Sequence, residues 1–374
     1  MLTIKHTNPE KNWAARRWEI KLEYWIVQTP FFMTVWTIWT IKWIEADKIK
    51  DFWAEIMLSN TYHLHLRPWD ELVKEMWWLH KFMNWDRPIL TDSWWYQVFS
   101  LWKLRKISEE WVAFRSHICG KKLFLSPEKV MEIEHNLWVD IAMVLDECPP
   151  FPCTKQYALD SLERTTRWAK RCLDHHKKLW SDKFQKLFAI VQWWVYADLR
   201  EMSAKQLTSM DFDWFAIWWV SVWEPTIEMY KAVDNAIPFL PENKPRYLMW
   251  VWTPENILEA VEKWVDMFDC VMPTREARHW RVYTKDWYIN IKWEKYKKDL
   301  SPIDEWCICP ACTKYSKAYV RHLFTAKEAL WQNLASMHNI AFYQNLMKEI
   351  REALEEDRFL EYKEDFLKRY CKSK

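Results

Sequence analysis

Three cysteines lie within six residues of one another, at Cys307, Cys309 and Cys312, whereas the other six cysteines are scattered. Thiolate and imidazole are the usual ligands of tetrahedral Zn²⁺, so we expect a zinc site whose fourth ligand is His338. Four protein ligands leave no open position, which predicts one structural zinc ion. The alternative is three ordinary buried cysteines. The odd total of nine cysteines suits a reducing compartment with a metal site better than a disulfide framework.

Polar side chains end several apolar, strand-like runs. Asp92, Asp146 and Gln192 each follow such a run, and Asp269 lies inside another. A carboxylate is costly to place there unless it is paired or used. Two carboxylates that flank a glycosidic bond provide a nucleophile and a proton carrier for displacement at an anomeric carbon. The alternative is that each aspartate only caps its strand.

Basic residues give a weaker indication of function. Arg275 and Arg278 follow the last apolar run and would suit contacts to phosphates or base edges, although solvated charge explains them equally well. The basic stretch 164–178 is more simply a solvated helix face. The net charge of +2 and pI near 8.0 make no case for a nucleic-acid partner by themselves.

The elements that must position these residues repeat along the chain. Eight short apolar runs alternate with amphipathic, helical stretches, which favours parallel βαβ units. Eight units predict an α/β fold of the closed (β/α)8 type, with its active site at the carboxyl ends of the strands. An open, doubly wound sheet is the alternative. The expected strands are residues 31–35, 55–58, 88–90, 141–145, 187–191, 215–217, 246–249 and 267–271. The expected helices are residues 44–52, 71–82, 127–137, 157–179, 199–210, 226–236 and 254–263.

The two ends of the chain depart from this repeat. The first 28 residues alternate apolar and polar positions around residues 8–11, which predicts an N-terminal β-hairpin. Residues 284–313 are polar and carry the cysteine cluster, and residues 316–370 are again helical in pattern. We therefore expect a hairpin and barrel over residues 1–283, and a zinc-binding subdomain with C-terminal helices over residues 284–374. The N-terminus is too polar for a signal peptide, and no apolar run reaches the roughly 18 residues of a membrane span, so we expect a cytoplasmic protein.

The composition is abnormal in two residue types. The chain has 1 Gly and 32 Trp, whereas average usage of about 7% would give roughly 26 glycines. Tryptophans also stand where glycine punctuation belongs, as in the turn at residues 67–70. We interpret most of them as replacements of glycine. A tryptophan surface for stacking on bases and a tryptophan-rich core are the alternatives, but neither explains the missing glycine.

Several motifs in order are similar to those of the bacterial tRNA-guanine transglycosylase family. Residues 89–100, ILTDSWWYQVFS, resemble the family motif ILTDSGG[FY]QVFS with both glycines changed. Residues 191–194, VQWW, resemble its VQGG segment, and residues 215–225, FAIWWVSVWEP, resemble a loop that ends in GEP. Residues 268–275, FDCVMPTR, match without change, and the cysteine cluster with its distant histidine matches the family's zinc site.

This resemblance implies a fold and a set of roles. The fold would be a (β/α)8 barrel with a zinc subdomain near its C-terminus. Asp269 would be the nucleophile at C1′ of the wobble nucleotide, and Asp92 the general acid/base. Asp146 and Gln192 would hydrogen-bond the purine edge, assisted by the backbone N–H of Trp219.

The resemblance also implies the substrate contacts. Tyr96 and Met249 would sandwich the base, and a loop at residues 274–278 would position the anticodon. The other implied substrate-binding residues are Ser93, Trp94 and Trp95. The implied RNA-binding residues are Trp250, Thr274, Arg275, Glu276, Ala277 and Arg278. Tryptophan stands at family glycine positions near the base at Trp94, Trp95, Trp193, Trp218, Trp219, Trp223 and Trp250, and we expect these indoles to occupy the base pocket.

The implied activity is replacement of the wobble guanine of tRNAs with GUN anticodons by a 7-deazaguanine base, in queuosine biosynthesis. Cys148 and Val222 fit the bacterial pattern, which favours 7-aminomethyl-7-deazaguanine, and bacterial members form homodimers. A non-catalytic tRNA-binding or scaffold homologue on the same fold is the alternative, against which Asp92 and Asp269 argue. An unrelated metal-dependent hydrolase would need histidines at strand ends, and the sequence shows no such set.

Overall fold

The structure is a computed structural model of the chain. It describes residues 2–8, 10, 14–38, 40–92, 106–147, 149, 153–192, 196–218 and 226–371. No helix in these ranges is both long and apolar enough to cross a membrane.

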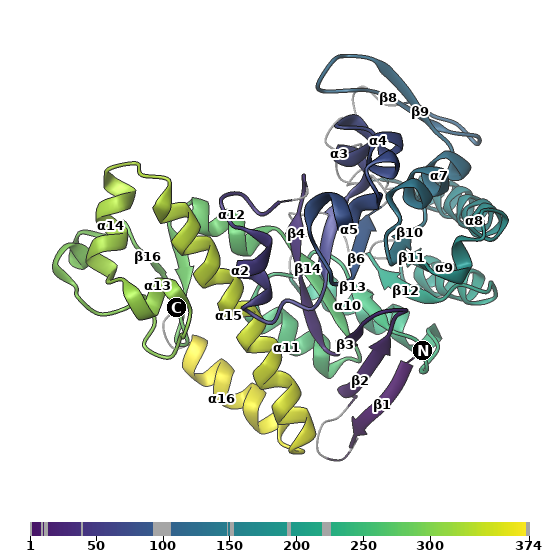
Figure 1. The fold of residues 1–374 in the computed structure, drawn as a ribbon. Helices are drawn as coiled ribbons and strands as arrows, with labels where there is room; N and C mark the ends of the chain where they lie inside the picture. The colour runs from purple at the N-terminus through teal and green to yellow at the C-terminus, as the bar shows by residue number, and fades with distance from the viewer. Residues whose placement is uncertain are drawn as a thin grey trace.

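Eight parallel strands close into a barrel at the centre of the molecule, which confirms the predicted fold class (Figure 1). They follow one another around the barrel in sequence order, and β14 pairs with β4 to close it. Their side chains are almost all buried, as expected for strands covered by helices on the outside. The strands are β4 (Phe31–Trp36), β5 (Met57–Asn60), β6 (Ile89–Asp92), β10 (Ile141–Met143), β11 (Lys186–Val191), β12 (Trp214–Ile217), β13 (Arg246–Leu248) and β14 (Met267–Cys270).

Helices follow the barrel strands, as the amphipathic stretches predict. Hydroxyl side chains begin three of them: Ser126, Thr154 and Thr253 each accept a backbone N–H of the first turn. The expected helix 71–82 is two helices, because Trp77 lies between them in a left-handed conformation. The helices are α2 (Ala46–Lys50), α3 (Thr61–Leu66), α4 (Asp70–Glu75), α5 (Trp78–Met83), α7 (Pro127–Leu137), α8 (Lys155–Lys178), α9 (Ala197–Thr208), α10 (Thr226–Ala236), α11 (Pro254–Glu262) and α12 (Met272–Arg278), with short 3₁₀ helices at Ser181–Lys183 and Ile237–Phe239.

Two small antiparallel sheets lie outside the barrel. The N-terminal one has three strands, β1 (Leu2–Thr7), β2 (Arg16–Lys21) and β3 (Ile26–Gln28), so the predicted hairpin is present with one strand more. The second was not expected and lies between β6 and α7. It consists of β7 (Lys106–Ile107), β8 (Val112–Arg115) and β9 (Lys122–Leu125).

The C-terminal part lies on the side of the barrel opposite α8 and α9 (Figure 1). Its long helix α15 packs on β4, where Gln344 Nε2 donates to the carbonyl of Phe32 at 2.9 Å. The pair β15–β16 spans the boundary expected at residues 283 and 284, and the division itself stays a prediction. The elements are β15 (Arg281–Tyr283), β16 (Tyr288–Asn290), the 3₁₀ helix Glu294–Lys298, α13 (Pro310–Lys314), α14 (Lys317–Thr325), α15 (Leu330–Glu355) and α16 (Phe359–Cys371).

Tryptophan occupies backbone conformations that favour glycine. Thirteen non-glycine residues among those described have positive φ, and ten of them are tryptophan. The left-handed region places Cβ too close to the carbonyl oxygen, so only glycine adopts it freely. This supports the interpretation that tryptophan stands at glycine positions. The ten are Trp43, Trp53, Trp69, Trp77, Trp78, Trp138, Trp180, Trp250, Trp264 and Trp280.

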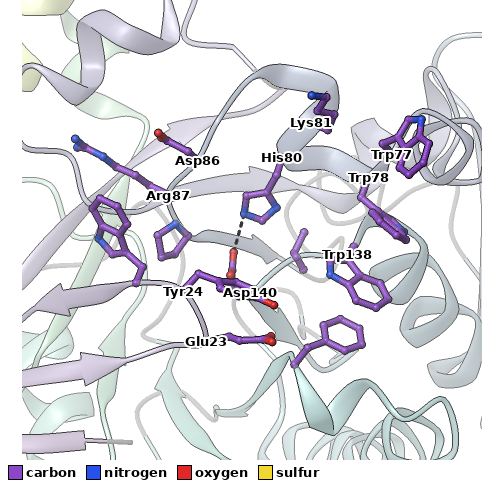
Figure 2. Close-up of a pocket in the computed structure, with 14 residues that line it drawn as sticks. Glu23, Tyr24, Trp77, Trp78, His80, Lys81, Asp86, Arg87, Trp138 and Asp140 are labelled. Carbon is purple, nitrogen blue, oxygen red and sulfur yellow. Dashed lines mark ion pairs between the residues drawn. The ribbon is translucent and has the colours of Figure 1, made fainter.

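Three of these indoles line a pocket of about 350 Å³ at the amino ends of β6 and β10 (Figure 2). Trp77, Trp78 and Trp138 share it with an ion pair in which His80 Nε2 lies 3.0 Å from an oxygen of Asp140. Active sites of such barrels lie at the other, carboxyl end of the strands. The pocket is therefore a poor candidate for the catalytic site.

Candidate active site and metal centre

Asp92 is the last residue of β6 and its carboxyl lies at the carboxyl rim of the barrel. Asn60, the last residue of the neighbouring β5, donates from Nδ2 to Asp92 Oδ2 at 2.8 Å. The carbonyl oxygen of the same Asn60 side chain accepts the N–H of His63 and caps α3. The amide is thus held by the helix it begins, and it fixes the orientation of the Asp92 carboxyl.

Asp269 lies in β14, which β4 and β5 separate from β6 around the same rim, and it is 2% exposed. Its Oδ1 accepts the hydroxyl of Tyr247 at 2.6 Å and the backbone N–H of Trp250 at 2.9 Å. Burial raises the pKa of Asp269 to about 6, against the opposing effect of these two hydrogen bonds. The carboxylate is therefore the main form at pH 7, and its Oδ2 forms no hydrogen bond with the described part of the chain.

Asp146 and Gln192 follow β10 and β11 and are both buried. Gln192 Nε2 is in contact with Asp146 Oδ2, whereas Asp146 Oδ1 has no hydrogen-bond partner among the described residues. Burial raises the pKa of Asp146 well above its usual value, and the charge of Asp92 raises it further. A buried polar oxygen without a partner is unfavourable, which suits a site completed by a bound polar molecule.

The four side chains form one constellation at the carboxyl rim. The charge of Asp92 acts on Asp146 on one side. On the other, burial and Asp269 raise the pKa of Tyr247, and the charge of Asp92 raises it further. The arrangement therefore combines two carboxyls suited to displacement and proton transfer with a neighbouring amide and carboxyl suited to hydrogen bonding.

Tryptophans border this constellation. Trp218 follows β12, and its ring meets that of Trp250 edge to face at 5.7 Å between centroids. Trp250 has φ 64°, which lets its N–H reach Asp269. Met249, the residue before it, is buried with its N–H bonded to the carbonyl of Ile217.

The expected anticodon loop at residues 274–278 is a helix in the structure, because Pro273 at its first turn suits a helix start and α12 continues to Arg278. Thr274 and Ala277 are buried, and Glu276 pairs with Arg281 at 2.9 Å. Arg275 is exposed and Arg278 is half-buried. Burial and the nearby charge of Arg275 lower the pKa of Arg278, and neither arginine forms an ion pair with another described residue.

Several expected site residues lie outside the described ranges. They are Ser93, Trp94, Trp95, Tyr96, Cys148, Trp219 and Val222.

The expected metal ligands converge. The sulfur atoms of Cys307, Cys309 and Cys312 and a ring nitrogen of His338 all lie within 4.8 Å of one another. Cys309 caps α13, Cys312 lies one turn later, and His338 comes from α15. The neighbouring thiols lower the pKa of Cys309 to about 4, because they donate to its thiolate.

The imidazole is oriented for ligation. His338 Nε2 lies 2.5 Å from the carbonyl oxygen of Tyr283, and Nδ1 lies 3.2 Å from the sulfur of Cys312. Because a carbonyl only accepts, Nε2 carries the proton and Nδ1 presents its lone pair to the cluster. The group could hold a metal ion, and three sulfurs with one nitrogen are a donor set that zinc prefers.

Sequence reasoning missed Asn60 and Tyr247, which hold the two aspartates. The expected second strand ended at residue 58, before Asn60, because Ser59 and Asn60 are polar. Tyr247 lies inside an apolar run and looks like any core aromatic. Asn60 could have been found by inspecting the first two polar residues after each apolar run, because it follows the run at residues 55–58 by two positions.

Comparison with known proteins agrees with this architecture. Residues 11–372 match the family described as queuine tRNA-ribosyltransferase. Proteins of that name are 51% identical over 365 residues in Desulforamulus reducens, with 98% of each chain covered, and 50% identical over 371 residues in Fusobacterium nucleatum, with 99% of each covered. One from Clostridium botulinum is 50% identical over 367 residues, covering 96% of this chain and 98% of the relative. The chain belongs to the queuine tRNA-ribosyltransferase family.

Proposed function

We propose that the protein is a tRNA-guanine transglycosylase that exchanges the wobble guanine of GUN anticodons for 7-aminomethyl-7-deazaguanine by double displacement. The observation that carries the proposal is the constellation of Asp92, Asp146, Gln192 and Asp269 at one rim of a closed barrel. A family match alone leaves open whether the site is equipped for chemistry, whereas these side chains supply each group that the reaction needs.

In the first displacement, Asp269 attacks C1′ of the wobble ribose. A bond forms between the carboxylate oxygen and C1′, and the bond from C1′ to N9 of guanine breaks. Tyr247 and the N–H of Trp250 hold one oxygen of Asp269, which directs the other toward the sugar. Asp92 supplies the proton to the departing base.

In the second displacement, the incoming base replaces Asp269 at C1′. Asp92, now a carboxylate, takes the proton from N9 of that base, and the ester bond to Asp269 breaks as the new bond forms. Each step inverts the anomeric centre, so the product keeps the original configuration.

The purine edge would be bound by Asp146 and Gln192. The raised pKa of Asp146 favours its neutral form, which can donate from its O–H as well as accept. The Gln192 amide offers a donor and an acceptor beside it. Such paired groups recognise a base that has hydrogen-bond donors and acceptors side by side on one edge, as guanine and 7-deazaguanines have.

Zinc would be held by Cys307, Cys309, Cys312 and His338. A metal with four protein ligands has no position for substrate, so it would fix α13 against α15 and take no part in the exchange.

The remaining features of the proposal are drawn from the family resemblance. The preference for the aminomethyl base would depend on Cys148 and Val222. Trp250 and residues 274–278 would bind the tRNA, with Arg275 and Arg278 as phosphate contacts. The enzyme would be a cytoplasmic homodimer.

One observation favours a non-catalytic tRNA-binding homologue as a second candidate. Trp218 and Trp250 pack against each other beside Asp269, where the family has glycine. We expect these indoles to exclude the base from the chain as it stands. The activity assays therefore need a second protein, which we call the glycine-restored chain. In it, glycine replaces Trp94, Trp95, Trp193, Trp218, Trp219, Trp223 and Trp250.

Exchange of labelled guanine into tRNA tests the proposal. The glycine-restored chain should incorporate label, and Asp92→Asn and Asp269→Asn in that chain should not. Asp140→Asn is the matched control, because Asp140 lies at the amino end of the barrel, where its carboxyl accepts the N–H of Ile89. A folded glycine-restored chain without exchange activity would favour the non-catalytic alternative.

A further inference from the structure

Glu134 is a fully buried carboxyl that the proposed reaction does not use. It lies on α7, outside the barrel, and is 0% exposed. Among the described residues no basic side chain forms an ion pair with it, although buried carboxyls are usually paired. Its partners are two threonine hydroxyls instead.

Those threonines lie next to the site. Thr61 Oγ1 donates to Glu134 Oε1 at 2.7 Å, and Thr91 Oγ1 bonds to Glu134 Oε2. Thr61 directly follows Asn60, and Thr91 directly precedes Asp92. Neighbouring side chains of a strand point to opposite faces, so Thr91 points out toward α7 while Asp92 points to the mouth of the barrel.

We propose that Glu134 is a positioning residue for the base-exchange site. From outside the barrel, its carboxyl connects Thr61 and Thr91, which are the chain neighbours of Asn60 and Asp92 at the ends of β5 and β6. The hydrogen bond from Asn60 to Asp92 joins the same two strand ends on the inside. The two bridges together fix the separation of the β5 and β6 termini. This inference rests on the proposed function.

The surroundings of Glu134 favour the neutral form of its carboxyl. Burial raises its pKa well above the usual value, and the negative charges of Asp92 and Asp70 raise it further. Asp70 is itself engaged by His65 at 2.5 Å and by Asn136 at 2.8 Å, so no cation from that side is left to neutralise Glu134. A neutral acid bridges two hydroxyls without placing a second negative charge beside Asp92.

Glutamine and methionine separate the two parts of this proposal. Glu134→Gln keeps the shape and the ability to donate and accept, but cannot ionise. Glu134→Met fills similar space with no polar atom, and leaves Thr61 and Thr91 without their bridge. Gln185→Met is the matched control, because Gln185 is equally buried but bonds only to backbone carbonyls here, those of Glu134 and Val139, and not to the Glu134 carboxyl.

The protonation state is tested in the chain as it stands. The folded-state pKa lies above the unfolded value, so the Glu134 proton stabilises the native state at low pH, and this contribution is lost as the pH rises from the unfolded value toward the folded one. The melting temperature of Glu134→Gln relative to the parent should therefore rise between pH 4 and pH 7. A carbon NMR signal of a protonated carboxyl at pH 7, lost in Glu134→Gln, should accompany it. A carboxylate signal, or a difference in melting temperature that falls with pH, overturns the neutral acid.

The positioning role is tested in the glycine-restored chain. Glu134→Gln should retain kcat, while Glu134→Met should lower kcat by about 10-fold or more with little change in KM for the base, since misplaced catalytic groups slow the chemical step. Gln185→Met should lower the melting temperature and keep kcat per folded molecule. If Glu134→Met does not fold, Thr91→Val removes one side of the bridge and should show the same loss in kcat.

Two failures are distinguishable. A folded Glu134→Met or Thr91→Val protein with the parent's kcat overturns the positioning role. A folded glycine-restored parent without exchange activity overturns the proposed function instead, and leaves the NMR and melting tests of Glu134 in force.

Discussion

Trp180 offers a direct test of whether tryptophan stands at glycine positions. It lies just beyond the C-cap of α8, with φ 60° and ψ 16°, at the position where helices commonly end in a left-handed glycine. The residue is 71% exposed, so little packing is lost when its side chain is removed. Trp306 is a matched control, because it is 74% exposed but is not among the residues with positive φ.

The magnitude follows from two opposing terms. A left-handed conformation costs a residue with a Cβ about 1–2 kcal/mol. Glycine gives back about 0.5–1 kcal/mol of this through the greater freedom of the unfolded chain. Trp180→Gly should therefore raise the free energy of unfolding by about 0.5–1 kcal/mol, and Trp306→Gly should lower it by about the same amount.

The effect is amplified by combining exposed positions. An unfolding entropy of about 2 cal/mol/K per residue makes the melting temperature rise by only about 1.3 °C per kcal/mol in a chain of this length. Five substitutions should raise it by about 3–6 °C in differential scanning calorimetry. The five residues are exposed and have positive φ: Trp43, Trp53, Trp69, Trp77 and Trp180.

Calorimetry of the two single variants and the fivefold variant decides the matter. A fivefold variant that melts no higher than the parent would refute the reasoning. An equal rise from Trp306→Gly would do so too, because loss of an exposed indole rather than relief of backbone strain would then be the cause.

Three further outcomes are expected. Cys309→Ala should reduce bound zinc from one ion per chain to none by metal analysis and unfold the surrounding subdomain, and unchanged zinc content would exclude this site. In the glycine-restored chain, kcat/KM should fall on the acid side with an apparent pKa near 6, because Asp269 must be ionised to attack. Tyr247→Phe should move that limb to higher pH, because it removes a hydrogen bond that lowers the pKa of Asp269 in the parent. A limb that does not move would assign the titration to another group. Competition between free bases in the same chain should favour the aminomethyl base through Cys148 and Val222, and equal use of full-size queuine would argue against that pair.

The barrel could be predicted because its strands are buried on both faces. Each one is a short apolar run, such as residues 187–191 within β11, and turn residues and amphipathic helices separate the runs. This pattern depends on local composition, so it survives replacement of glycine by tryptophan. The zinc ligands could be predicted for the same reason, because three of the four lie within six residues.

Features that depend on contacts between distant residues were not predicted. The short strands β7 and β9 have no buried run of their own and are defined by pairing with β8. The bond from Asn60 to Asp92 joins residues 32 positions apart, and the bridge from Glu134 to Thr61 spans 73. Nothing in local composition marks such partners. The helix α12 was expected as a loop, because the family resemblance implied a loop at residues 274–278.

The covalent intermediate provides the most direct test of the central claim, that Asp269 attacks the ribose. The glycine-restored chain is mixed with substrate tRNA, and the adduct is measured on a denaturing gel beside a thermal melt of each variant. Asp140→Asn should form the adduct as the parent does, and Asp92→Asn should still form some, because both keep the nucleophile. Asp269→Asn should form none, since an amide cannot replace the carboxylate. A folded Asp269→Asn protein that still forms the adduct would contradict the mechanism.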